Sequence, residues 1–111
     1  MTDTRQLFGC PVELALEVLG GKWKTVLLAR LKQGPLRYGE LRRAVPRLSD
    51  KMLTTRLREL EELGLIARDP GDAPERYRLT ARGESLRPVL QSLYDWGLAH
   101  VDELEARLAP P

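Results

Sequence analysis

Side chains that could bind an anionic polymer are concentrated at residues 49–58. The helical period of about 100° per residue places Leu53, Leu57 and Leu60 on one side of a predicted helix at residues 49–63. The opposite side is cationic and carries hydroxyl groups up to Arg58, and beyond Arg58 the helix becomes acidic. A helix of this layout can place its basic N-terminal half in an anionic groove while its acidic half stays outside. This is how a helix reads DNA from its first turns.

The polar face of this helix supplies groups that match the edges of DNA bases. Arginine carries paired donors suited to guanine, and threonine or methionine can contact a thymine methyl group or a base edge. Ser49 is in addition a good N-cap, because its hydroxyl can accept a free amide N–H of the first turn. We therefore expect a major-groove reading face made of Ser49, Lys51, Met52, Thr54, Thr55 and Arg58.

The distribution of charge along the chain favours a polyanionic partner. The net charge is only +2. Between residues 22 and 58, however, eleven Lys or Arg residues stand against Glu40 and Asp50, whereas the rest of the chain has seven basic and fourteen acidic residues. Such segregation predicts one face meant for a polyanion such as double-stranded DNA. The alternative is that the basic residues are scattered over a solvated surface.

Two helices joined by a short turn are expected to position the reading face. A helix at residues 38–45 is followed by a proline-containing turn and then by the reading helix, which is the helix-turn-helix pattern. The bare pattern is weak, because packed helices with a short link occur in many all-α cores. Two further helices precede it, at residues 10–21 and from residue 22 onward. In the first of these, Pro11 suits the first helical position and places Cys10 at or beside the N-cap.

The residues after the reading helix predict a wing. Residues 65–69 and 75–79 read as two short strands, and in the second strand Arg76 and Arg78 alternate with Tyr77. Arginines on one face of such a hairpin would reach phosphates or the minor groove, whereas a merely structural hairpin is the alternative. The residues expected on the DNA backbone or wing are Arg37, Arg42, Arg43, Arg56, Arg76 and Arg78, with Arg56 equally suited to a structural ion pair.

The last predicted helix begins after the N-cap Thr80 and runs to residue 108, and Pro88 should kink or interrupt it. Apolar residues recur along it at spacings of three and four, further than a domain of this size needs for its own core. Such a surplus face usually packs on a partner, and self-association is the simplest option. The predicted homodimer interface consists of Leu90, Leu93, Trp96, Gly97, Val101 and Leu104.

Length and composition limit the class of protein. The 111 residues suit one domain, and 42% hydrophobic with 31% charged residues predicts a folded chain. No apolar run approaches the roughly 20 residues of a membrane span, and residues 1–9 lack a signal peptide's apolar stretch. With a single cysteine, we expect a cytoplasmic protein without membrane contact. His100 is the only histidine, and no glycine-rich phosphate loop or nucleophile motif occurs, so we expect no catalytic residue, metal site or cofactor.

A resemblance to the HxlR-type winged helix-turn-helix regulators of bacteria rests on three stretches, CPVELALEVLGGKWKTVLLARL, RYGELRRAVPRLSDKMLTTRLRELEELGLI and YRLTARGESLRPVLQSLYDWG. The most specific segments are Gly-Gly-Lys-Trp at 20–23 and Lys-Met-Leu-Thr at 51–54. The resemblance implies a mainly α fold with a small β-hairpin, in which a MarR-like winged helix-turn-helix core at 22–79 lies between dimerisation helices at 10–21 and 80–108.

The same resemblance implies a cytoplasmic homodimer that binds operator DNA, an inverted repeat by its symmetry, and represses or sometimes activates nearby genes. Some members sense oxidants or electrophiles through a cysteine at the position of Cys10, so an oxidant or small-molecule effector is an open expectation. The hairpin loop is a few residues shorter than in many relatives, which puts any minor-groove contact in doubt. The alternative from another functional class is a winged-helix module that binds an acidic protein, and salt-dependent binding to duplex DNA separates the two.

Overall fold

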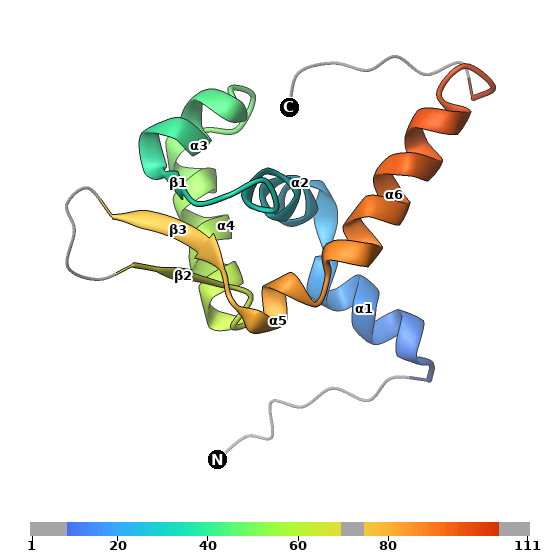
Figure 1. Ribbon diagram of the computed structural model, residues 1–111, viewed down its shortest axis with the longest axis horizontal. Coiled ribbons are helices and arrows are strands. Elements are labelled where there is room, and N and C mark those ends of the chain that lie inside the picture. Colours follow the sequence, from blue (N-terminus) through green and yellow to red (C-terminus); the bar gives the residue numbers. More distant parts are fainter. Residues whose placement is uncertain (1–8, 70–74, 105–111) are drawn as a thin grey trace.

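The computed structural model describes residues 9–69 and 75–104, and it is mainly helical with one small sheet (Figure 1). Helices occur in each region where one was predicted, and the helix expected at residues 49–63 begins and ends within one residue of its expected bounds. The elements in chain order are α1 (Pro11–Leu19), α2 (Gly21–Leu31), β1 (Leu36–Arg37), α3 (Tyr38–Ala44), α4 (Asp50–Glu62), β2 (Ile66–Arg68), β3 (Arg76–Leu79), α5 (Ala81–Glu84) and α6 (Arg87–His100).

The sheet has three antiparallel strands in the order β1-β3-β2, one more than the predicted hairpin. Strand β3 pairs with β2 through Ile66 and Leu79, and with β1 through Leu36 and Tyr77. The two-residue strand β1 escaped prediction because it is too short to show an alternating pattern. Its pairing ties the segment before α3 to the wing, so the helix-turn-helix and the hairpin form one unit.

The core is made almost entirely of leucine and lies around α2 (Figure 1). Leu27 and Leu28 of α2 and Leu53, Leu57 and Leu60 of α4 are all fully buried or nearly so. Each buried leucine contributes on the order of 1.5–3 kcal/mol relative to an exposed one. This packing fixes α4 with its apolar side inward and leaves its polar side toward solvent.

Helix α1 contributes to the buried core through its C-terminal end. Leu19 is buried and Val18 half-buried, whereas Val12 and Leu16, which share the helical spacing of Leu19, are exposed. The periodic apolar residues of α1 therefore lie mostly outside the core of the chain.

The C-terminal segment is divided into two helices rather than forming one. Thr80 caps α5 as predicted, with its hydroxyl oxygen accepting the backbone N–H of Gly83 at 3.1 Å. The break lies between residue 84 and residue 87, and Pro88 stands in the first turn of α6, where its missing N–H costs nothing. Helix α6 ends at His100, and residues 101–104 form a turn. The prediction of helix at residues 101–104 was therefore wrong, and its continuation over residues 105–108 lies outside the described residues.

Candidate nucleic-acid interface

The N-terminal half of α4 presents a polar face built by the sequence pattern and by its cap. Ser49 caps the helix, because its Oγ accepts the backbone N–H of Met52 at 3.2 Å. Lys51, Thr54 and Arg58 are exposed on the side opposite the buried leucines. These spacings of three and four put the three side chains on one surface, where they can enter a groove together.

Two of the predicted reading residues are less freely presented. Met52 is half-buried and packs against the core, and the Oγ1 hydroxyl of half-buried Thr55 donates to the backbone oxygen of Lys51 at 2.9 Å. Both side chains therefore take part in building α4, in addition to any contact they make with a base.

The turn between α3 and α4 is tied together by a cluster that we call the Tyr38–Arg42–Asp50 cluster. Arg42 Nε donates to Asp50 Oδ1 at 2.8 Å, and the Tyr38 hydroxyl lies 3.0 Å from the same oxygen. The carboxylate thus holds two side chains of α3 against the first residue of α4. Arg42 was expected to grip phosphate, but in the structure its guanidinium is paired with an acid within the protein.

Arg56 was expected either to contact a phosphate or to form a structural ion pair. Its guanidinium forms an ion pair with Glu59 one turn further along α4, and its side chain is half-buried. The structure therefore shows the structural ion pair rather than a free cation aimed at a phosphate.

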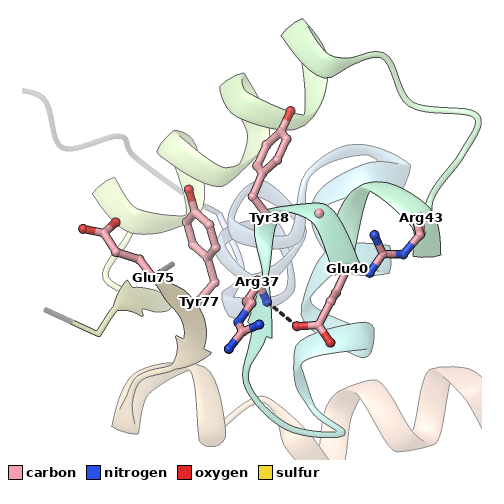
Figure 2. A pocket seen from close by; sticks show the side chains of 7 residues that line it. Arg37, Tyr38, Glu40, Arg43, Glu75 and Tyr77 are labelled. Atoms are coloured by element: carbon pink, nitrogen blue, oxygen red, sulfur yellow. Dashed lines mark hydrogen bonds between the residues drawn. The ribbon is translucent and has the colours of Figure 1, made fainter. Parts of the chain in front are cut away.

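An open depression lies between the start of α3 and strand β3, and it contains two of the predicted backbone contacts. Figure 2 shows Arg37 and Arg43 on either side of Glu40, whose carboxylate accepts the backbone N–H of Arg37 at 2.9 Å. Tyr38 and Tyr77 line the same depression and point toward α4. Arg37 and Arg43 are exposed, so their guanidinium groups are accessible to a ligand on this side.

The wing arginines differ from one another in how they are engaged. Arg78 is ion-paired with Asp69 across the hairpin, whereas Arg76 is exposed and lies directly opposite Arg37 in the β1–β3 pairing. Like charges placed opposite each other in a sheet are destabilising, so an anion between Arg37 and Arg76 would relieve repulsion. The tip of the wing, residues 70–74, lies outside the described residues.

The inner side of the wing carries a second charge network. Arg68 Nε lies 3.2 Å from Glu61 of α4, and its Nη1 lies 3.5 Å from Glu75. Glu61, followed by Tyr77 and Glu75, raises the pKa of Arg68 above its ordinary value. Burial raises the pKa of Tyr77, and Glu61 and Glu75 act in the same direction. Arg68 was not among the predicted site residues, and this network anchors the hairpin to the acidic half of α4.

Large apolar side chains are exposed on α1 and α6. These two helices lie on the far side of α2 from α4 (Figure 1). Leu93 and Trp96 of the predicted interface are 51% and 59% exposed, whereas Leu90 is 3% exposed and belongs to the protomer's own core. The inclusion of Leu90 was therefore wrong, because α6 turns that residue toward α2. The α1–α6 surface consists of Val12, Leu14, Leu16, Val89, Leu93, Tyr94, Trp96 and Leu98, and Leu104 is exposed in the turn that follows.

The remaining predicted interface residues lie along the same part of the chain. Gly97 is exposed on α6, and Val101 is half-buried in the turn after it. Tyr94 and Leu98 were missed, although their spacing of four residues was visible in the sequence. Val12, Leu14 and Leu16 could not be assigned from the pattern alone, because an apolar stripe does not say whether its own domain or a partner covers it.

Cys10 and His100 lie near the two ends of this surface. Cys10 is exposed at the N-cap position of α1, as predicted. The imidazole of His100 stacks on Trp96 with ring centroids 4.2 Å apart, and its Nδ1 lies 2.9 Å from the backbone oxygen of Trp96. The histidine thus packs against Trp96 on the surface of α6.

Two negative findings apply to the part of the chain at 9–69 and 75–104. No three His, Cys, Asp or Glu side chains there come together as metal ligands would. No helix within those ranges is both long and apolar enough to cross a membrane.

Comparison with known proteins identifies relatives along most of the chain. A family model described as HxlR-like helix-turn-helix matches residues 18–105. An uncharacterised helix-turn-helix-type transcriptional regulator of Methanothermobacter thermautotrophicus is 46% identical over 91 residues, which is 79% of this chain and 70% of the relative. The redox regulator HypR in its reduced form is similar in structure, with a TM-score of 0.81 and 39% identity over 86% of this chain and 98% of that one. Quinone-bound YodB from Bacillus subtilis has a TM-score of 0.69 and 35% identity, covering 79% and 97%.

Proposed function

Because the chain belongs to the HxlR-like helix-turn-helix family of transcriptional regulators, we propose that it binds a specific operator as a homodimer and represses the adjacent genes. The observation that carries this proposal is the exposed face of Lys51, Thr54 and Arg58 on the N-terminal half of α4. The buried leucines on the opposite side of α4 hold this face outward, so it is available to a major groove without rearrangement. Its site of action is then the cytoplasm, where the chromosome lies.

Lys51, Thr54 and Arg58 differ in the base groups that each is suited to contact. Arg58 can donate two hydrogen bonds to a guanine, and the Thr54 methyl or hydroxyl can meet a thymine methyl or a base edge. Lys51 lies in the first turn of α4, nearest the groove floor in the N-terminal docking mode. Each good base contact is worth about 1–3 kcal/mol of discrimination.

Contacts to the DNA backbone are proposed for Arg43, Arg37 and Arg76. Arg43 lies on α3, the helix that crosses the backbone in this class of motif. Arg37 and Arg76 stand opposite each other in the sheet, and a phosphate between them would turn an unfavourable pair into a clamp. These contacts position the protein on any duplex without reading its sequence.

The homodimer is proposed to form through the α1–α6 surface. Its large side chains are exposed on two helices, α1 and α6, and monomeric proteins rarely leave a large apolar surface open to water. We further propose that the two-fold axis is oriented so that both copies of α4 lie on the same side of the dimer. The operator would then be an inverted repeat with half-sites about one helical turn or slightly more apart, roughly 10 base pairs.

Cys10 is the proposed point of action for an oxidant or electrophile. Its exposed sulfur stands at the start of α1, beside the proposed interface, and two structural relatives carry redox or quinone in their names. The chain has no second cysteine, so oxidation would give a sulfenic acid or a disulfide with a small thiol or the other subunit. A change at this position could shift α1 in the dimer and alter the spacing of the two reading helices.

Selection of bound duplexes from a random pool tests the proposed function directly. The expected result is enrichment of an inverted repeat, with an affinity for it that falls steeply as salt rises. Weak, sequence-independent binding, or capture only of acidic proteins, would instead support an interaction module and would overturn the proposal.

A further inference from the structure

The first residue of α4 is an acid, and it lies at the end of the helix that the proposed function places in the DNA. Asp50 is exposed over 75% of its side chain, yet its carboxylate is engaged by α3. Arg42 Nε donates to Oδ1 at 2.8 Å, and the Tyr38 hydroxyl lies 3.0 Å from Oδ1 and 3.3 Å from the backbone oxygen of Asp50. The Arg42 guanidinium also reaches the backbone oxygen of Val45 at 3.4 Å, where α3 ends.

These contacts join the two helices of the helix-turn-helix at one point. Arg42 spans from the last turn of α3 to the first turn of α4, and Tyr38 reaches the same carboxylate from the first turn of α3. Because Tyr38 and Arg42 hold the Asp50 carboxylate from two turns of α3, their contacts fix the angle between α3 and the N-terminal end of α4. A negative charge at this position is also favoured by the positive end of the α4 dipole.

The pairing has an electrostatic consequence for DNA binding. Arg42 and Asp50 together are locally neutral, so Arg42 offers little net charge to a phosphate while the pair is intact. Arg43, its neighbour on α3, is exposed and has no such partner among the described residues. The two adjacent arginines should therefore behave differently toward DNA, although the sequence gives no sign of it.

We propose that the Tyr38–Arg42–Asp50 cluster is a specificity-determining element that aims the reading end of α4, and that Arg42 acts by positioning Asp50 rather than by neutralising a phosphate. The inference rests on the proposed function, because it concerns the same reading helix. The cluster contributes to the preference for operator over other duplexes and little to sequence-independent affinity.

Charge-neutral variants test the positioning role. Tyr38→Phe and the double variant Arg42→Met/Asp50→Asn remove the contacts without changing net charge. Dissociation constants for a duplex selected from a random pool and for its scrambled counterpart would be measured over a range of salt concentrations. The operator-to-scrambled ratio should fall about tenfold, as for loss of one base contact. Binding to the scrambled duplex and its salt dependence should stay at wild-type values.

Two further variants separate positioning from charge. Asp50→Asn alone keeps an oxygen for Arg42 and Tyr38 but unmasks the arginine charge. Both duplexes should then bind about threefold tighter or more, with a salt slope steeper by roughly 0.9 and an unchanged ratio. Arg43→Gln is the matched control: it should weaken both duplexes alike and lower the slope by roughly 0.9.

The outcomes distinguish the inference from the function on which it rests. A double variant that weakens both duplexes equally and lowers the salt slope would make Arg42 a phosphate contact and overturn the inference. An unchanged ratio in variants whose urea unfolding matches wild type would overturn it as well. A wild-type protein that shows no preference between the duplexes would instead contradict the proposed function.

Discussion

Replacing Leu93 and Leu104 with aspartate should dissociate the proposed dimer. Each leucine is more than half exposed in the single chain, so burying the rest of its side chain in a dimer would stabilise the dimer by roughly 1 kcal/mol. Two leucines in each of two subunits therefore contribute about 4 kcal/mol, which alone is close to a thousandfold in the dimer Kd. Buried, unpaired carboxylates would add several kcal/mol more.

Light scattering on a sizing column measures this effect directly. The wild type should be a dimer at micromolar concentration, and the double variant a monomer that keeps its helical circular dichroism. Thr54→Asp is the control for an added carboxylate, since it places one aspartate at an exposed position of α4. It should remain dimeric while losing DNA binding. A monomeric wild type, or a double variant as dimeric as wild type, would refute the assignment of this surface.

Three further predictions concern stability and redox response. Gly83→Ala would place a Cβ 2.1 Å from the backbone oxygen of Leu65, so it should lower the free energy of unfolding by about 1–3 kcal/mol or more. The Cβ of Gly97→Ala would meet nothing within 4 Å, so this substitution should raise the free energy of unfolding by about 0.5–1 kcal/mol. Urea titration of the two variants compares these effects. Burial raises the pKa of Tyr77 above its unfolded value of about 10, so the contribution of this residue to the free energy of unfolding is present below about pH 10 and is lost as the pH rises through the folded pKa. Tyr77→Phe should therefore flatten the fall in the free energy of unfolding above about pH 10. An identical fall in wild type and variant would argue against this assignment. Diamide or a quinone should release operator DNA from wild type but not from Cys10→Ser, and equal behaviour of both proteins would exclude a sensor at this position.

The features that were predicted correctly are those encoded by neighbouring residues. The leucine spacing of α4 and the serine at its N-cap depend on contacts within one or two turns, so both were visible in the sequence. The inward and outward alternation of β3 was visible for the same reason: Tyr77 is half-buried while Arg76 and Arg78 are exposed.

The features that were missed depend on contacts between distant segments. Strand β1 exists because Leu36 pairs with Tyr77, forty-one positions later. Leu90 and the apolar residues of α1 follow the same periodic pattern, yet Leu90 faces α2 and Leu16 faces outward. A periodic pattern identifies an apolar side, but only the packing of whole helices decides what covers it.

The candidate site shows the same division. The exposure of Lys51, Thr54 and Arg58 follows from the amphipathic pattern. The pairing of Arg42 with Asp50 does not, because it crosses the turn between two helices. Counting the basic residues in the sequence therefore overestimates how many are free to contact DNA, because some are ion-paired within the protein.

Comparison of wild type with Arg58→Ala on a selected operator and on its scrambled counterpart tests the central claim most directly. Arg58 is exposed on the proposed reading face of α4, so its loss should cost about 1–3 kcal/mol on the operator and far less on the scrambled duplex. Arg87→Ala serves as the control, because it removes the same charge from α6, where Arg87 pairs with Glu84. Loss of discrimination in Arg58→Ala alone is the predicted result. An unchanged preference for the operator in Arg58→Ala would contradict the assignment of α4 as the reading helix.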